Sequence, residues 1–380
     1  MESTIWDGWK QKAVMDIRLD EQQKLLQSTF TRFFAERCSL DRVRELEAGA
    51  GHDPALWASL ADLGALGLLV PEAHGGLGGA FAEATLLSEV IGGALYPSPF
   101  LWTSVVAPYL IEQLGDAPTL AAWLPRIANG TAIIALADDT ASDPAASPLR
   151  AVPAGPGWRI HGEARFVEYA RHADALLLAA DLSGRTMLFL ITPGRAGVTI
   201  ERRSEISGGQ FFRVAFDGVV LRAEELLSGD AGMLLEQSLD RARVLLAARM
   251  VGAAQRVFDL TLRYTRERSQ FGQPLLRFQA LNFRLAALLT RIDGARLLAA
   301  HAAWLIDQRQ PFAHAALFAK AQAAEIYREM AAEAIQLHGG FGFTAEASPQ
   351  LFYRRAAADA MLLGNATALR ERIAAYLELS

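Results

Sequence analysis

The glycines near residue 340 and the histidines are the first candidates for chemistry, and neither set is sufficient alone. The segment Gly340-Phe-Gly342-Phe-Thr-Ala345 superficially fits the dinucleotide fingerprint G-x-G-x-x-A. That fingerprint needs a preceding strand, whereas a helical pattern precedes this segment, so a Rossmann interpretation fails. The chain has 7 histidines, none in an H-E-x-x-H pair or beside a cysteine cluster, so we expect no metal site. P-loop and G-x-S-x-G motifs are also absent from the sequence.

Three longer stretches are weak singly but specific in combination. They are Tyr264-Thr-Arg-Glu-Arg268-Ser-Gln270-Phe271-Gly272 with Phe278-Gln279, then Gln336-Leu337-His338-Gly339-Gly340-Phe341-Gly342-Phe343-Thr344, then Tyr353-Arg354-Arg355-Ala356. In this order and at these spacings, the chain resembles the acyl-CoA dehydrogenase family. LGLLVPEAHGGLGG (66–79) looks like the N-terminal Pro-Glu-x-x-Gly-Gly loop of that family. The resemblance covers nearly the whole chain from about Met15.

The resemblance implies that the chain contacts the nucleotide end of an FAD. In the family, an arginine at the position of Arg268 and an aromatic residue at that of Phe271 reach the pyrophosphate and adenine of an FAD held mainly by a neighbouring subunit. A guanidinium offers a pyrophosphate fixed charge and a fork of donors. The segment at Gln336, Gly339 and Gly340 lets backbone amides approach the same dinucleotide. The remaining candidate cofactor contacts are Gln270, Phe278, Gln279 and Leu337.

These segments also have ordinary interpretations, which the sequence leaves open. Arg268 is equally the type of residue found solvated at the end of a helix. The glycines at 339 and 340 are typical of a helix stop.

Around the flavin ring, the resemblance is degenerate. The family carries a Thr-Glu-Pro-x-x-Gly-Ser-Asp type loop and a Trp-x-Thr or Trp-x-Ser segment, where this chain has ADDTASD (137–143) and Phe166-Val167-Glu168. Phe166 could still lie against the ring. Glu168, however, would place a carboxylate where a neutral hydroxyl is expected, and an anion opposes the charge that a flavin gains on reduction. The chain's own ring pocket is therefore doubtful.

The general base of the family is also missing. Family members remove the α-proton of an acyl-CoA with a glutamate, and both family positions for that residue hold alkyl side chains here, Leu363 and Ala242. Asp240 and Arg243 match positions that contact CoA in the family. Asp359 is a replacement base only by proximity, one helical turn before Leu363, and could as well be a surface carboxylate. GNAT (364–367) departs from the usual Gly-Thr-x-Gln flavin contact. We therefore assign no catalytic residue.

Three functions remain open on this basis. In the preferred hypothesis, the chain resembles the small or β-type subunits of heteromeric acyl-CoA dehydrogenases, which lack the base and complete an FAD site in a partner. The alternatives are a homomeric FAD enzyme with altered chemistry or a displaced base, and a flavin-free structural or binding protein. The resemblance implies an acyl-CoA or acyl-carrier thioester as substrate, a related subunit in a homo- or hetero-oligomeric dimer or tetramer, and electron-transfer flavoprotein as electron acceptor.

Hydrophobic periodicity predicts the elements that must position these residues, and the fold class is α+β. Helical patterns run from Asp20 to about Arg37 and across 54–66, 81–94, 100–113 and 117–128. From Thr131 to about Leu227, short apolar runs separated by Gly, Pro and Ser predict a β domain, antiparallel or barrel-like, with a strand over 212–217 closed by an Asp-Gly turn at 217–218. Leu285, Leu288, Leu289 and Ile292 mark one helix face in the last third.

We therefore predict an N-terminal all-α domain (1–130), a middle β domain (131–228) and a C-terminal helical domain resembling a four-helix bundle (229–380). Residues 1–14 are set apart as an appendage, because a better amphipathic segment begins at Met15.

Composition limits the class of protein and its partners. The chain has 380 residues, of which 52% are hydrophobic, and a net charge of −5, so we expect a folded protein with no affinity for nucleic acid. No apolar run approaches the roughly 18 residues of a membrane span. The single cysteine, Cys38, cannot form an internal disulfide and fits a reducing, cytoplasmic location.

Overall fold

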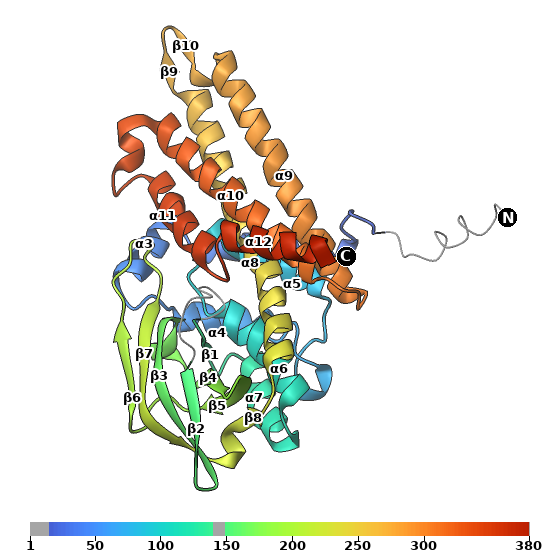
Figure 1. Cartoon of the computed structure of the whole chain (residues 1–380). Helices are drawn as coiled ribbons and strands as arrows, with labels where there is room; N and C mark the ends of the chain where they lie inside the picture. The colour runs from blue at the N-terminus through green and yellow to red at the C-terminus, as the bar shows by residue number, and fades with distance from the viewer. Residues whose placement is uncertain (1–14, 140–148, 380) are drawn as a thin grey trace, which may run out of the picture.

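The computed structural model describes residues 15–139 and 149–379. Helices make up the first third of the chain, strands the middle third and longer helices the last third. The predicted α+β architecture is therefore confirmed. Figure 1 shows the sheet at one end of the molecule and the long C-terminal helices extending away from it. The predicted appendage, residues 1–14, lies outside the described residues.

The N-terminal helices begin at side-chain caps. Asp20 caps the first helix and Asp53 caps the third, in each case by accepting hydrogen bonds from backbone N–H groups of the first turn. The helices are α2 (Glu21–Arg37), α3 (Leu40–Ala48), α4 (Pro54–Asp62), α5 (Phe81–Ala94), α6 (Ala107–Leu114) and α7 (Ala117–Ala128). The helix predicted over 54–66 stops at Asp62, and the one predicted over 100–113 contains a π-helical turn, η2 (Trp102–Val106).

The middle region is an eight-stranded sheet with the order β6-β7-β3-β2-β4-β5-β8, and β1 pairs with β4. Most pairs are antiparallel, as predicted, but β4 pairs in parallel with both β1 and β2. The strands are β1 (Ile134–Ala137), β2 (Leu149–Ala154), β3 (Gly157–Glu168), β4 (Ala175–Leu182), β5 (Arg185–Ile191), β6 (Val198–Arg202), β7 (Phe211–Leu221) and β8 (Leu226–Ser228).

The Asp-Gly turn predicted at 217–218 is wrong. Strand β7 continues through both residues to Leu221. Ile160 pairs with Val219 and Gly162 with Phe216, so Asp217 and Gly218 together face one residue of β3. Such a β-bulge accommodates an extra residue, and Gly218 adopts a φ of 61° there without strain.

The C-terminal region is built on three long helices, α8 (Gly232–Glu267), α9 (Gln279–Asp307) and α10 (Ala313–His338), followed by α11 (Ser348–Met361) and α12 (Ala366–Leu379). The predicted face of α9 is buried at Leu285, Leu288 and Ile292. Helix α8 also packs closely on α5. A Cβ atom on Gly92 of α5 would lie 1.9 Å from the carbonyl oxygen of Arg249, so only glycine allows this approach.

Within the described part of the chain, every helix is too short or too polar to cross a membrane.

Candidate functional site

A ring stack joins the two segments predicted to contact FAD. Tyr264, near the end of α8, stacks on His338, at the end of α10, with ring centroids 4.1 Å apart and planes at 21°. The His338 ring is also fixed by a hydrogen bond between Nδ1 and the Ala334 carbonyl, and burial lowers the pKa of this imidazole. Arg268 and Gly339 each follow one of the stacked residues within a few positions. The fold therefore presents the two predicted segments together.

The backbone of Arg268 is fixed while its side chain is free. Arg268 is the C-cap of α8, its N–H donates to the Tyr264 carbonyl, and its own carbonyl accepts from the Leu275 N–H. Its exposed guanidinium has no hydrogen-bond or ion-pair partner among residues 15–139 and 149–379. An unpaired guanidinium on a fixed backbone suits the binding of an external anion.

Beside Arg268 lies an aromatic pair of which Phe271 is exposed and Phe278 is half-buried. Phe271 is 93% exposed and its ring meets Phe278 edge-on, with centroids 6.3 Å apart. Its φ of 52° lies in the left-handed region, which is unfavourable for a phenylalanine. Gln270 and Gln279 flank the pair and are also exposed. A phenylalanine held outward at a cost in backbone strain indicates a surface that another molecule covers.

The glycine segment after α10 leaves space for a ligand. A Cβ atom added to Gly339 or Gly340 would meet nothing within 4 Å, and Gly339 has a φ of 64°. Gln336 is exposed on the last turn of α10. Leu337 differs from the expectation, because its side chain packs into the core and leaves only its backbone available to a cofactor.

At the predicted ring end, Phe166 is 57% exposed at the end of β3. Asp139 braces this strand end, since its carboxylate accepts from the Arg165 N–H at 2.7 Å and the Phe166 N–H at 3.2 Å. Positions 140–143 of the degenerate loop lie outside the described residues.

The Glu168 carboxylate is held by a residue of the N-terminal region. Its Oε2 accepts a 2.7 Å hydrogen bond from Trp102 Nε1. Burial raises the pKa of Glu168, and the nearby Arg249 guanidinium opposes that rise. The structure therefore keeps an acidic side chain, anchored to Trp102, where the resemblance calls for a neutral hydroxyl.

The predicted base position holds a fully buried alkyl side chain. Leu363 is 0% exposed and has a φ of 58°. Its carbonyl accepts a 3.1 Å hydrogen bond from Nε of Arg243, a residue of α8. The alternative position, Ala242, is also 0% exposed. Neither side chain can accept a proton.

The structure brings the two predicted substrate residues into direct contact. Asp240 Oδ1 lies 2.6 Å from Nη1 of Arg243, and the same Nη1 lies 2.7 Å from Glu236 Oε1. Burial raises the pKa of Asp240 to about 6, against the attraction of Arg243. Glu236 also pairs with Arg372 of α12 at 2.6 Å. Arg243, Glu236 and Arg372 line a cavity of about 180 Å³ together with Leu363.

Asp359 is not the surface carboxylate that the sequence allowed. It is 4% exposed, and its Oδ1 forms a 2.7 Å ion pair with Nη2 of Arg249. Its carboxylate is therefore engaged by Arg249 inside the fold.

Lys320 was missed by the sequence reasoning. It lies 0% exposed on α10, and its Nζ donates to the Ala360 carbonyl at 2.8 Å and to the Gly364 carbonyl. Burial lowers its pKa to about 7. Lys320 thus fixes carbonyls before and after Leu363, and Arg243 fixes the carbonyl of Leu363 itself. The signal was present in the sequence, since Lys320 is the only charged residue between His314 and Glu325 in an alanine-rich helix.

Comparison with known proteins agrees with this arrangement. The acyl-CoA dehydrogenase N-terminal domain matches residues 20–131 and the acyl-CoA dehydrogenase C-terminal domain matches residues 232–377. Acyl-CoA dehydrogenase IpdE2 of Mycolicibacterium smegmatis is 30% identical over 91% of this chain and 96% of its own length. The chain belongs to the acyl-CoA dehydrogenase family. As a family member it is an oxidoreductase and flavoprotein, since enzymes of this family use FAD.

Two further proteins are similar to most of this chain. (2S)-Methylsuccinyl-CoA dehydrogenase of Cereibacter sphaeroides is 31% identical over 86% of this chain, which spans only 64% of that longer protein. The solved ChsE4-ChsE5 complex from Mycobacterium tuberculosis superimposes with a TM-score of 0.90 at 26% identity, covering 96% of this chain and 100% of the other.

The described residues fit the two ends of FAD unequally. The free guanidinium of Arg268, the exposed Phe271 and the open space at Gly339 and Gly340 fit the pyrophosphate and adenine. At the ring end, Phe166 offers an aromatic surface, but Glu168 offers a carboxyl group whose charge disfavours a reduced flavin. Among the described residues, no cluster of His, Cys, Asp or Glu is arranged to bind a metal ion.

Proposed function

We propose that this chain is the non-catalytic subunit of an acyl-CoA dehydrogenase, which completes the FAD site of a related, base-containing subunit. One observation carries the proposal: the base position is occupied by Leu363, fully buried and fixed through its carbonyl by Arg243. The α-proton of a thioester is weakly acidic, so its removal needs a positioned base, which contributes about 10²–10⁴-fold to the rate. FAD, when bound, supplies the acceptor for the β-hydride.

The exposed residues at the ends of α8 and α10 support the same assignment. Arg268 and Phe271 point away from their own chain, toward solvent, so the dinucleotide that they suit is one carried by a neighbouring subunit. Gln336, Gly339 and Gly340 would bring backbone amides to that dinucleotide, and Gln270, Phe278 and Gln279 would border it. A chain that retains these residues while losing the base is expected for a supporting subunit.

The same proposal assigns a role to the predicted substrate residues. Asp240 and Arg243 keep the positions that contact CoA in the family, and Arg243, paired with Asp240, lines the same cavity as Leu363. In this account, the thioester, on CoA or a carrier protein, is oxidised at the partner's site. Electron-transfer flavoprotein is the proposed acceptor and the cytoplasm the proposed location. A chain of the ChsE4-ChsE5 complex is similar to this chain, and its presence in a complex supports a heteromer.

One observation favours a second candidate, a homomeric enzyme with a displaced base. Glu236 lines the same cavity as Leu363 and carries a carboxylate. However, Arg243 and Arg372 both pair with it, and their attraction leaves the pKa of Glu236 below its ordinary value. A base that holds its proton so weakly serves α-proton abstraction poorly.

Co-purification tests the proposal. The chain is produced alone and together with a base-containing acyl-CoA dehydrogenase from the same organism, and flavin per chain is read from absorbance near 450 nm. We expect little flavin on the lone chain, and a stable complex that is yellow and active. If the lone chain retains stoichiometric FAD and oxidises acyl-CoA as rapidly as the mixture, the subunit assignment fails.

A further inference from the structure

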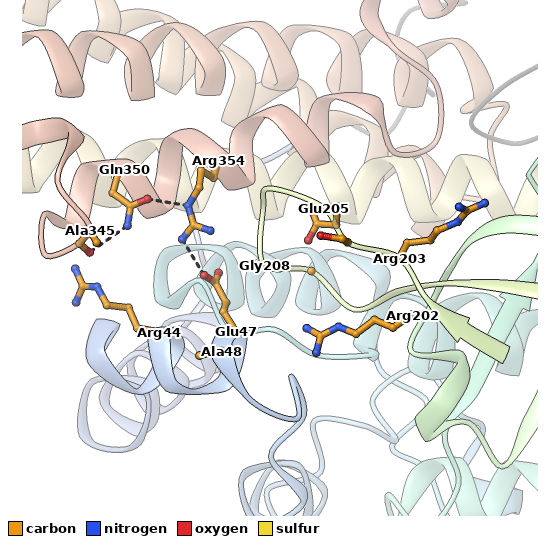
Figure 2. A pocket seen from close by; sticks show the side chains of 12 residues that line it. Arg44, Glu47, Ala48, Arg202, Arg203, Glu205, Gly208, Ala345, Gln350 and Arg354 are labelled. Atoms are coloured by element: carbon orange, nitrogen blue, oxygen red, sulfur yellow. Dashed lines mark hydrogen bonds and ion pairs between the residues drawn. The ribbon is translucent and has the colours of Figure 1, made fainter.

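A cleft of about 620 Å³ opens where the three regions of the chain meet (Figure 2). Helix α3 forms one wall, the segment between β6 and β7 a second, and the start of α11 with the preceding loop a third. None of its lining residues belongs to the proposed FAD or substrate contacts. We infer that this cleft binds an organic phosphate of about nucleotide size.

The lining of the cleft is basic in an otherwise acidic protein. It contains the guanidinium groups of Arg44, Arg202, Arg203 and Arg354 and the carboxylates of Glu47 and Glu205, so its formal charge is 4 − 2 = +2. The whole chain carries −5. A local excess of positive charge in a concave site concentrates anions.

The acidic side chain at the back of the cleft is already neutralised. Glu47 pairs through Oε2 with Arg354 at 3.0 Å and through Oε1 with Arg355 at 2.9 Å. Arg354 is held further by Gln350 and by the Ile206 carbonyl. Figure 2 shows this bonded group spanning the cleft from α3 to α11. The back wall is therefore rigid, and Glu47 has little charge left to repel an anion.

Donors remain open on two sides of this wall. Arg44 pairs through Nη1 with Asp41 and donates from Nη2 to the Glu346 carbonyl, but its Nε is buried without a hydrogen-bond partner in the described part of the chain. Arg202 donates from Nη1 to the Gly49 carbonyl at 3.4 Å and from Nη2 to the Gln210 side-chain oxygen at 3.1 Å, whereas the Arg203 guanidinium has no described partner. Unpaired guanidinium donors in a concave site favour phosphate, which accepts several charge-assisted hydrogen bonds at once.

The cleft also contains an unpaired acceptor. Glu205 accepts a 2.6 Å hydrogen bond from the Ser207 N–H through Oε2, whereas its Oε1 is buried without a partner among residues 15–139 and 149–379. A buried, unsatisfied carboxylate oxygen is costly, so it calls for a donor from a ligand. Inorganic phosphate supplies acceptors but few donors, whereas a sugar phosphate supplies a phosphate for the arginines and hydroxyls for Glu205. Pockets of roughly 300–1,000 Å³ hold ligands of this size.

Calorimetric titration of the full chain with AMP, adenosine and inorganic phosphate tests the inference. We expect AMP to bind, adenosine to bind about tenfold more weakly, and Arg202→Ala or Arg44→Ala to weaken AMP by about tenfold, the effect of losing one charged hydrogen bond. Glu205→Gln should weaken AMP relative to inorganic phosphate by about fivefold, because only AMP carries ribose hydroxyls for the carboxylate, whereas both anions gain equally from the lost negative charge.

Variants elsewhere separate this site from the proposed FAD contacts. Arg268→Ala should leave AMP binding in the cleft unchanged, and Arg185→Ala, on the exposed start of β5, controls for overall charge. If Arg268→Ala abolishes AMP binding while Arg202→Ala and Arg44→Ala do not, AMP occupies the FAD region and the inference is wrong. It is equally wrong if neither AMP nor phosphate binds at millimolar concentration. Both outcomes leave the subunit proposal standing.

Discussion

Tyr264 and His338 stack face to face across the ends of α8 and α10, 74 residues apart in the chain (338 − 264 = 74), with ring centroids 4.1 Å apart. This contact is the physical link between the Arg268 segment and the glycine segment that begins at Gly339. Helix packing alone would leave both ends free to fray, since terminal turns have unpaired backbone groups. The stack therefore holds the proposed dinucleotide contacts in register.

Replacing Tyr264 by leucine tests the stack. The variant keeps an apolar side chain but loses the ring contact, which is worth about 1 kcal/mol beyond its buried area. We expect the free energy of unfolding to fall by about that amount, and hydrogen exchange to accelerate at residues 265–272 and 338–343. Tyr353→Leu is the matched control, since Tyr353 is exposed on α11. Equal hydrogen-exchange rates at these residues in both variants would show that the stack does not link the two segments.

Arg268 should govern flavin retention in the assembly. Arg268→Ala removes a charged donor from the proposed pyrophosphate contact, so we expect FAD to bind at least about tenfold more weakly. Arg268→Lys should recover only part of this, because an ammonium lacks the planar fork. Arg263→Ala, an exposed arginine one turn earlier on α8, controls for charge. Flavin per complex after dialysis is the measurement, and identical retention by Arg268→Ala and Arg263→Ala would contradict the role.

Glu168 should make stability depend on pH in the acid range. Burial raises its pKa above the ordinary 4.5, so the folded state holds this proton more tightly than the unfolded state. The stability contributed by protonated Glu168 is therefore complete below pH 4.5 and is lost as pH rises toward the folded pKa. Glu168→Gln keeps an acceptor for Trp102 without the charge, so it should be more stable than the wild type at pH 7 but not at pH 4.

Urea unfolding at pH 4 and pH 7 measures this effect, with Glu36→Gln, an exposed glutamate of α2, as the control. A Glu168→Gln protein that is less stable than the wild type at pH 7 would mean that the ionised carboxylate is favourable where it lies.

Lys320 should make stability depend on pH in the neutral to alkaline range. Its pKa falls from 10.5 to about 7, because burial disfavours the ammonium. Below pH 7 both the folded and unfolded states bind this proton, and the cost of burying the charge is complete. As pH rises above 7, the folded state releases the proton first, so stability should increase by up to about 1.4 kcal/mol per pH unit.

Lys320→Met should abolish that increase, although it also loses the bonds to the carbonyls of Ala360 and Gly364. Denaturant unfolding between pH 6 and pH 9 gives the slope, and Lys24→Met, at an exposed surface lysine, should keep the wild-type slope. A wild-type slope in Lys320→Met would assign the pH dependence to another group.

The sequence predicted elements whose signals are local. The apolar period in α2, α5 and α7 and the alternation in β7 were sufficient to place them, because each pattern is complete within one segment. Helix α3 was missed, since its nine residues include five charged ones and only a short apolar face. The bulge at Gly218 was mistaken for a turn because it exists only through pairing with β3, about 55 residues earlier in the chain.

The site was predicted in the same uneven way. The resemblance assigned Arg268, Phe271 and the glycines to one dinucleotide and the missing base to Leu363, and these roles stay predictions. No local pattern could show that Arg243 bonds the Leu363 carbonyl or that Asp359 pairs with Arg249, because each pair joins residues more than 100 positions apart. The exposed or buried state of a carboxylate such as Asp359 depends on such distant partners.

Restoring a carboxylate at the base position tests whether the missing base alone accounts for inactivity, or whether the altered flavin-ring end also does. Leu363→Glu should yield little dehydrogenase activity in the lone chain, because the Glu168 carboxyl still occupies the ring end and a buried charge destabilises the 360–364 loop. Leu363→Met, of similar volume and polarity, serves as the control for packing.

Anaerobic mixing of the lone chain, supplied with added FAD, with a panel of acyl-CoA thioesters tests the central claim most directly, with flavin absorbance near 450 nm as the readout. The account predicts no bleaching on the timescale in which the complex with its base-containing partner is fully reduced. Rapid, stoichiometric bleaching of the lone chain by any of these thioesters would contradict it, because a proton acceptor would then have to exist within this polypeptide.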